Sequence, residues 1–208
     1  MKLYYATGTC SLAPHIVARE AGRALEIERV DIQSQPHRTE GGTDFTGINP
    51  KGYVPALRLD DGQVLTEGVA IMQYLADLAP DAGLAPPAGT IERYRLQEWL
   101  TFISSELHKM FSPWLFHPEH GELAQEAANA KIADRFAFLD RHLAAERYLL
   151  GERFSAADAY AFTIVGWSRL ARIDLGPYPS LAAYMDRVAA RPGVQAAVQA
   201  EGLLRAAS

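Results

Sequence analysis

The sequence of 208 residues contains a single cysteine, Cys10. One cysteine cannot form an internal disulfide or assemble a cysteine-rich zinc or iron–sulfur site, so a reducing compartment is expected. No stretch of about eighteen apolar residues occurs, so no membrane-spanning helix is expected either. The chain starts with a strand-like run instead of a long apolar segment, which argues against a signal peptide. The predicted location is therefore the cytoplasm.

Positive charge is not in excess, since 20 Lys and Arg residues stand against 25 Asp and Glu residues and the formal net charge is -5. This balance argues against nucleic acid and membrane surfaces as partners, and a small molecule or a protein is expected instead. Apolar residues make up 49% of the sequence and charged residues 22%, and repeats or low-complexity tracts do not occur. Such a composition is typical of a globular protein with a sizeable core.

The first eighty residues alternate short β-type runs with helical runs. We predict strands over 2–6, 26–31, 55–59 and 63–65, and helices over 11–21 and 67–78. Asp60-Asp61-Gly62 separates the last two strands and indicates a hairpin, because glycine supplies the positive φ of a tight turn. The result is a βαβ unit followed by a ββα unit.

The segment 80–89 is rich in proline and glycine, which cannot continue a helix or a central strand. We therefore predict an α/β domain over 1–79, a linker over 80–89 and an all-helical domain over 90–208. Further helices are expected over 123–144, 156–171, 180–190 and 193–200. Ser155 and Asp158 are typical of a capping box at the start of one of them.

Two stripes run along the first helix of the predicted helical domain. Leucine and isoleucine recur at spacings of four, three and four, which indicates a core face: Leu96, Leu100, Ile103 and Leu107. At about 100° per residue, a polar row falls on another face: Tyr94, Glu98, Thr101, Ser105, His108 and Ser112. Ordinary solvent exposure explains most polar faces, but this row, next to Lys109, also suits a polar ligand.

Cys10 stands where the first strand passes into the first helix. Unpaired backbone N–H groups and the helix dipole at such a position stabilise a thiolate and lower the pKa of a thiol. On position alone, a small buried apolar cysteine is the more common alternative.

Two further segments point to a peptide-like ligand. If the Val54–Pro55 bond is cis, Val54 offers its backbone N–H and C=O to an extended peptide, although a trans bond at a strand edge is far more common. In the second segment, Thr66 can cap a helix whose first turn holds Glu67 and Gly68. The Gly68 N–H can then bind a ligand carboxylate and the Glu67 side chain a ligand ammonium. The alternative is a well-formed helix cap with no ligand.

The pair His117 and His120 stands in a proline-containing loop without a third ligand in the nearby sequence. A solvated turn explains these residues better than a metal site, so no metal is expected.

Several motifs in order and spacing resemble the bacterial beta-class glutathione transferases, and the resemblance runs from Met1 to about Leu204. The matching segments are Lys2-Leu3-Tyr4-Tyr5, Cys10-Ser11-Leu12 with Pro14-His15-Ile16, Asn49-Pro50-Lys51-Gly52, Val54-Pro55-Ala56-Leu57, Leu65-Thr66-Glu67-Gly68-Val69-Ala70-Ile71, Glu106-Leu107-His108-Lys109 and Ala157-Asp158-Ala159-Tyr160. The resemblance implies a thioredoxin-like N-terminal domain, an all-helical C-terminal domain, a homodimer, and glutathione held in the cleft between the domains.

Carried over residue by residue, the resemblance implies roles for individual side chains. The residues expected to act on the glutathione sulfur are Cys10, Ser11 and His108. The expected glutathione contacts are Cys10, His37, Val54 before a cis Pro55, Glu67, Gly68, Thr101, Ser105, Glu106, His108 and Lys109. Two positions depart from the family pattern, because His37 or Arg38 stands in place of a lysine and Thr101 in place of an asparagine. Glu106 lies off the polar row, which sets it apart from the other contacts.

The resemblance implies a transferase that conjugates the thiol of reduced glutathione to small hydrophobic electrophiles. Position 13 is alanine, so a mixed disulfide on Cys10 must be released by a second glutathione, and thiol–disulfide exchange is the closest alternative. A non-catalytic ligand-binding or interaction protein of the same fold is a third possibility. The electrophile cannot be identified, since Phe111, Trp114, Phe116 and Trp167 can line its pocket or belong to the core.

Overall fold

The computed structural model describes residues 1–203. The chain divides into two compact units, one made of Met1–Ala85 and the segment from Arg191 onward, the other of Pro86–Ala190. No helix among the described residues is long and apolar enough to cross a membrane.

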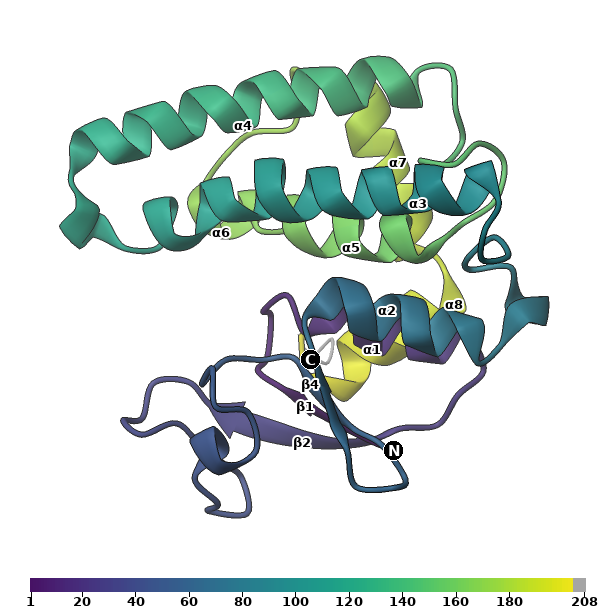
Figure 1. Ribbon diagram of the computed structural model, residues 1–208. Coiled ribbons are helices and arrows are strands. Elements are labelled where there is room, and N and C mark those ends of the chain that lie inside the picture. Colours follow the sequence, from purple (N-terminus) through teal and green to yellow (C-terminus); the bar gives the residue numbers. More distant parts are fainter. Residues whose placement is uncertain (204–208) are drawn as a thin grey trace, which may run out of the picture. The chain divides into compact units, whose positions relative to one another are not determined.

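The first unit is built on a mixed sheet with the strand order β3-β2-β1-β4-β5. Strands β1, β2 and β4 of this sheet are labelled in Figure 1. Its elements are β1 (Lys2–Tyr5), α1 (Leu12–Glu20), β2 (Glu26–Asp31), β3 (Arg38–Thr39), the 3-10 helix η1 (Phe45–Gly47), β4 (Ala56–Arg58), β5 (Val64–Thr66), α2 (Gly68–Asp77) and the 3-10 helix η2 (Pro80–Ala82). Strand β1 is parallel to β2 and antiparallel to β4, and β4 and β5 form an antiparallel hairpin. The predicted βαβ and ββα order is confirmed, whereas the two-residue strand β3 is too short to leave a pattern in the sequence.

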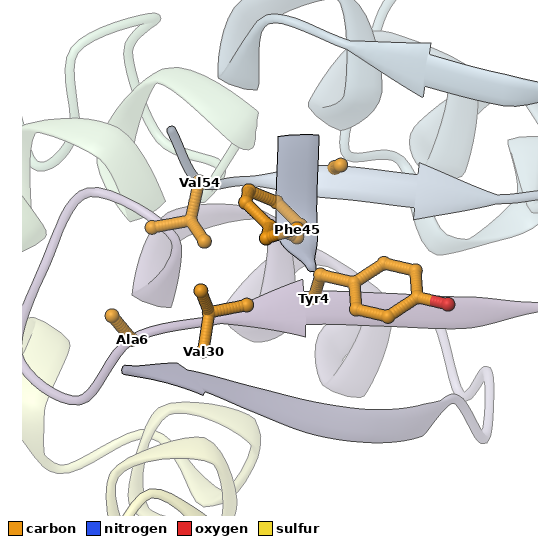
Figure 2. Close-up of a cluster of buried hydrophobic side chains, with 6 residues drawn as sticks. Tyr4, Ala6, Val30, Phe45 and Val54 are labelled. Atoms are coloured by element: carbon orange, nitrogen blue, oxygen red, sulfur yellow. The ribbon is translucent and has the colours of Figure 1, made fainter. Parts of the chain in front are cut away.

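One face of the sheet carries a buried cluster that includes Tyr4, Ala6, Val30, Phe45 and Val54 (Figure 2). The Tyr4 and Phe45 ring centroids lie 5.8 Å apart. Because side chains alternate along a strand, Leu3 and Leu57 point to the opposite face, and both are fully buried. Helix α2 packs on β4 and against α1. The sheet therefore has apolar packing on both faces.

Helix α8 (Pro192–Ala200) returns to the first unit and packs along α1. Val194 and Ala197 are buried, and Arg191 pairs with Glu20. The sequence places this helix in the region 90–208 of the predicted helical domain, but the structure places it with the α/β unit; residues 204–208 of that domain lie outside the described residues. The apolar face of α8 packs against α1. The periodicity of the sequence predicts an apolar face but does not say which element covers it.

The second unit is all helical. It contains α3 (Ile91–Phe102), the π-helices η3 (Ile103–His108) and η4 (Met110–Leu115), the 3-10 helix η5 (Pro118–His120), α4 (Glu122–Leu143), α5 (Ala156–Val165), α6 (Ser168–Ala171) and α7 (Pro179–Ala189). The predicted core face is confirmed, since Leu96, Leu100, Ile103 and Leu107 are all fully buried.

Two helix predictions need correction in this unit. The α-helical geometry of α3 ends at Phe102 and wider π turns follow, so a uniform 100° per residue does not hold along the whole polar row. The row also breaks at Ser112, which has extended backbone angles before a cis bond to Pro113. The predicted helix 156–171 is divided into α5 and α6 at Gly166 and Trp167.

Candidate functional site

Cys10 lies in the turn between β1 and α1, two residues before the helix begins at Leu12. Its side chain is partly exposed, and its Sγ lies 3.6 Å from the backbone oxygen of Val54 and donates to it. The only thiol in the sequence is therefore held beside Val54, the residue predicted to pair with a peptide ligand through its backbone.

Ser11 is fully buried, and its hydroxyl is engaged within the same turn. The Ser11 Oγ lies 3.1 Å from both the backbone nitrogen and the backbone oxygen of Ala6, and 2.8 Å from Thr9 Oγ1. A hydroxyl with these partners fixes the shape of the turn that carries Cys10. This placement does not support the predicted action of Ser11 on a ligand sulfur, and it indicates a positioning role instead.

The Val54–Pro55 peptide bond is cis, which is the geometry that the family resemblance implies. The Val54 side chain belongs to the buried core cluster (Figure 2), and its backbone leads through Pro55 into β4. The ring of Pro55 lies against Gly68, because a Cβ placed on Gly68 would be 3.6 Å from Pro55 Cγ. Cys10, Val54, Pro55 and Gly68 are thus contiguous.

Glu67 is the residue before α2 and has a positive φ of 69°. Residues other than glycine rarely adopt a positive φ, because it strains the backbone. Such backbone strain concentrates at functional sites. The prediction that Thr66 caps the helix is wrong, since Thr66 is the last residue of β5 and Glu67 occupies the cap position without a side-chain capping bond. Its carboxylate is exposed and forms an ion pair with Lys51. The Lys51 Nζ also donates to Thr66 Oγ1 at 3.0 Å.

His37 is joined to the same region by its imidazole. Its Nδ1 lies 2.7 Å from the backbone oxygen of Gly52, and its Nε2 lies 3.3 Å from Gln35 Nε2. His37 therefore lies next to the loop that leads into Val54.

The helical unit carries the remaining predicted contacts on the end of α3 and on η3. Thr101, Ser105, Glu106 and Lys109 are exposed. The Ser105 Oγ donates to the backbone oxygen of Thr101 at 2.9 Å. The Glu106 carboxylate accepts from Arg135 at 2.7 Å. Glu106 thus has a partner on α4.

His108, the last residue of η3, has a lowered pKa. Burial, together with the nearby charge of Lys109, lowers its pKa from 6.5 to about 4, so the imidazole is neutral at pH 7. Its Nδ1 lies 2.7 Å from the hydroxyl of Tyr160, and its ring packs edge-on against Trp167 at 4.9 Å. A neutral imidazole can exchange a hydrogen bond with a sulfur but supplies no positive charge to it.

The aromatic candidates for an electrophile pocket are mostly packed against one another. Phe111 and Trp167 are buried, and both contact Phe116, which is 37% exposed. Trp114 is 38% exposed and packs on His120. Phe111 is therefore a core residue, whereas Trp114 and Phe116 present apolar surface.

Three of the predicted site residues have partners that the sequence does not indicate. Lys51 pairs with Glu67, Arg135 with Glu106, and Tyr160 with His108. Lys51 and Tyr160 both stand in segments that carry the family resemblance, but nothing in the spacing of those segments pairs them with residues far along the chain. Within the described residues, no group of three or more His, Cys, Asp or Glu side chains could hold a metal ion.

A thioredoxin-like unit with a thiol beside a cis-proline, followed by a helical unit, defines a class of proteins, and comparisons with known proteins identify it. Residues 7–78 match the model of the glutathione S-transferase N-terminal domain, and residues 102–192 match that of the C-terminal domain. The chain belongs to the glutathione S-transferase family and is therefore of the transferase class predicted from its sequence.

Individual relatives cover almost the whole chain. Glutathione S-transferase GstA of Escherichia coli O157:H7 is 46% identical over 98% of this chain and 100% of its own length. A glutathione transferase structure from Methylococcus capsulatus is 53% identical, with a TM-score of 0.94, over 98% of this chain and 99% of that chain. A bacterial beta-class enzyme from Sphingomonas chungbukensis is 47% identical, with a TM-score of 0.93, over 98% of this chain and 100% of that chain. The predicted fold and the beta-class resemblance are confirmed.

Proposed function

We propose that the protein conjugates the thiol of reduced glutathione to small hydrophobic electrophiles. A sphingomonad relative, 46% identical over 98% of this chain and 100% of its own, with a TM-score of 0.93, has been solved in complex with glutathione. The observation that carries the proposal is the contiguous row formed by Cys10, Val54, cis Pro55, Gly68 and Glu67.

Each part of this row suits one part of the tripeptide. The backbone N–H and C=O of Val54 can pair with the cysteinyl residue of glutathione as an added strand. The start of α2 at Gly68 suits the α-carboxylate of the γ-glutamyl end, and the Glu67 carboxylate suits its ammonium group. His37, next to Gly52, is the candidate for the glycine end. We further propose Thr101, Ser105, Glu106, His108 and Lys109 as glutathione contacts from the helical unit.

In the proposed reaction the thiol of glutathione loses its proton to water, and the sulfur attacks an electrophilic carbon. A carbon–sulfur bond forms while the bond to the leaving group breaks, and the leaving group departs with the bonding electron pair. The Cys10 thiol would donate a hydrogen bond to the negative sulfur, with neutral His108 as a further hydrogen-bond partner.

The test is a glutathione-dependent assay with an aryl halide as the electrophile. The assay measures the release of halide and the formation of the thioether. The proposal requires the rate to depend on both substrates and on the protein. If the protein is not retained on immobilised glutathione and forms no thioether, it is a non-catalytic member of its fold.

Thiol–disulfide exchange is a second candidate, favoured by the partly exposed Cys10 thiol beside Val54. In this reaction the Cys10 thiolate attacks a glutathione mixed disulfide and displaces the other thiol. A second glutathione thiolate then attacks the Cys10 adduct and leaves as oxidised glutathione. Cys10→Ala is expected to abolish this reduction and to leave part of the aryl-halide conjugation. Equal loss of both activities would show that the two reactions do not depend on separate chemistry.

The finer assignments also belong to this proposal. We propose that the protein is a homodimer, as the family resemblance implies. We also propose that it is located in the cytoplasm, because the lone cysteine suits a reducing compartment in which reduced glutathione is the co-substrate. The exposed aromatic side chains Trp114 and Phe116 are proposed as apolar contacts for the electrophile. Sedimentation of the purified chain tests the dimer directly.

A further inference from the structure

Lys51 contacts the carboxylate that the proposed function assigns to the ammonium group of glutathione. It stands on the loop before cis Pro55, 16 residues from Glu67 in sequence, and its Nζ bonds both Glu67 Oε1 and Thr66 Oγ1. The Tyr53 hydroxyl lies 3.4 Å from the same Glu67 oxygen. A cation, a carboxylate and the start of α2 thus meet within one small part of the first unit.

The chemistry of the γ-glutamyl end of glutathione matches this arrangement. Its ammonium and its α-carboxylate are bonded to the same carbon, so a ligand whose ammonium binds Glu67 must bring its carboxylate close to the same oxygen. Lys51 already reaches that oxygen. A carboxylate with two oxygens accepts several donors, so Glu67 can receive the ligand ammonium while Lys51 turns to the ligand carboxylate.

We propose that Lys51 determines specificity for the α-carboxylate of glutathione, so that Lys51 and Glu67 together recognise a zwitterionic amino acid end. This inference rests on the proposed function. It assigns a ligand contact to a residue of the Asn49-Pro50-Lys51-Gly52 motif, for which the sequence indicates no role.

Because the Lys51–Glu67 ion pair is exposed, breaking it costs little free energy. The side chains of Lys51 and Glu67 are 45% and 56% exposed, and exposed ion pairs contribute little to stability. The lysine stem is flexible, and Thr66 Oγ1 at 3.0 Å keeps the ammonium within reach of the site. Lys51 can therefore change from Glu67 to a ligand carboxylate without disturbing the fold.

The experiment is a calorimetric titration of the full chain with two tripeptides. One is glutathione, and the other is γ-aminobutyryl-cysteinyl-glycine, which lacks only the α-carboxylate. Lys51→Met keeps the stem and removes the charge, and it is expected to weaken glutathione binding about tenfold, as for the loss of one charge-assisted contact. The same change is expected to alter binding of the analogue by less than twofold. Lys131→Met, an exposed lysine on α4, is the matched control and should change neither affinity.

Several outcomes would overturn the inference. Equal weakening of both tripeptides by Lys51→Met would assign the residue a structural role. Unchanged or tighter binding of glutathione would show that Lys51 only competes for Glu67. If the wild-type chain binds neither tripeptide, the proposed function fails and this inference fails with it. A wild-type chain that binds glutathione but gives either of the first two results contradicts the role of Lys51 alone.

Discussion

At the scale of single residues, Glu67 combines a strained backbone with an exposed carboxylate. Its φ of 69° is a conformation that glycine adopts without cost, whereas a residue with a Cβ is strained there. A position that needs only a turn would favour glycine. The presence of glutamate is explained if the carboxylate is needed at this point, as the proposed ammonium site requires.

Replacing Glu67 by glycine is expected to change the stability of the protein and its affinity for glutathione in opposite directions. Glu67→Gly is expected to raise the free energy of unfolding by about 1 kcal/mol, because the positive φ is then unstrained. The same change is expected to lose most of the glutathione affinity. Urea unfolding and calorimetric titration measure the two effects, and Glu67→Ala is the control that removes the carboxylate and keeps the strain. A stability of Glu67→Gly no higher than that of Glu67→Ala would show that the backbone is not strained.

His108 gives a prediction for pH. The folded chain binds a proton on His108 only near pH 4, whereas the unfolded chain binds it near 6.5. Lowering the pH through this interval therefore favours the unfolded state, so this contribution to stability is complete above pH 6.5 and is lost toward pH 4.

Urea unfolding of the wild type and of His108→Gln at pH 7 and pH 4.5 tests this sign. The wild type is expected to lose on the order of 2 kcal/mol more than the variant on acidification. His120→Gln, which removes an exposed histidine, should behave like the wild type. Equal acid sensitivity of the wild type and His108→Gln would contradict the buried, neutral imidazole.

Single residues also show what the sequence can predict of the site. Cys10, Val54, Pro55 and Glu67 could be selected because each stands at a position where a strand or helix begins or ends. The role of Ser11 could not be judged, because its hydroxyl bonds to Ala6 and Thr9 depend on the three-dimensional closure of the turn. The Glu106–Arg135 pair joins two helices, and no local pattern encodes it.

At the scale of elements, the start of α5 is held by one buried carboxylate. Asp158 accepts from the backbone nitrogens of Leu149 and Ser155 at 2.9 and 2.8 Å, and from the Tyr184 hydroxyl at 3.1 Å. Burial raises its pKa, and these donors counteract the shift. The predicted capping box is confirmed and extends to two other segments of the helical unit.

Removing this carboxylate should destabilise the helical unit strongly. Asp158→Ala leaves several buried donors without an acceptor, and the free energy of unfolding is expected to fall by about 3 kcal/mol. Ser155→Ala removes the capping hydroxyl and leaves the carboxylate, and is expected to cost only about 1 kcal/mol. Thermal and urea unfolding compare the two variants. Similar losses in both would mean that Asp158 acts only as a helix cap.

The π turns mark the limit of prediction for elements. Apolar spacing placed α3 and its core face correctly, because an α-helix repeats every 3.6 residues. The change to π geometry at Ile103 leaves the buried positions Ile103 and Leu107 in place, so the apolar pattern carries no sign of it. The direction of His108 and Lys109 therefore could not be derived from helical angles.

At the scale of the whole molecule, the last described helix, α8, belongs to the first unit. α8 packs on α1, and the buried His15 Nδ1 lies 3.0 Å from Glu201 Oε1. The domain boundaries expected from composition, at 79 and 90, remain a prediction about functional domains. Composition predicts a linker, whereas the docking of α8 depends on a contact between distant parts of the sequence.

A chain that ends at Ala190 tests the contribution of α8. The truncation exposes the buried surface that α1 shares with Val194 and Ala197, and we expect a lower melting temperature for the first unit. The thiol of Cys10 should then react faster with an aromatic disulfide reagent, since the adjoining turn belongs to the same unit. An unchanged melting curve and an unchanged Cys10 reaction rate would show that α8 is not needed for this unit.

The central claim is that glutathione binds with its sulfur beside Cys10. The most direct measurement is the intact mass of the purified protein after incubation with oxidised glutathione, before and after addition of a reductant. Because Cys10 is the only thiol in the sequence, the account predicts one glutathionyl adduct that the reductant removes. A protein that binds glutathione but forms no adduct, while Cys10 still reacts with a small thiol reagent, would contradict it.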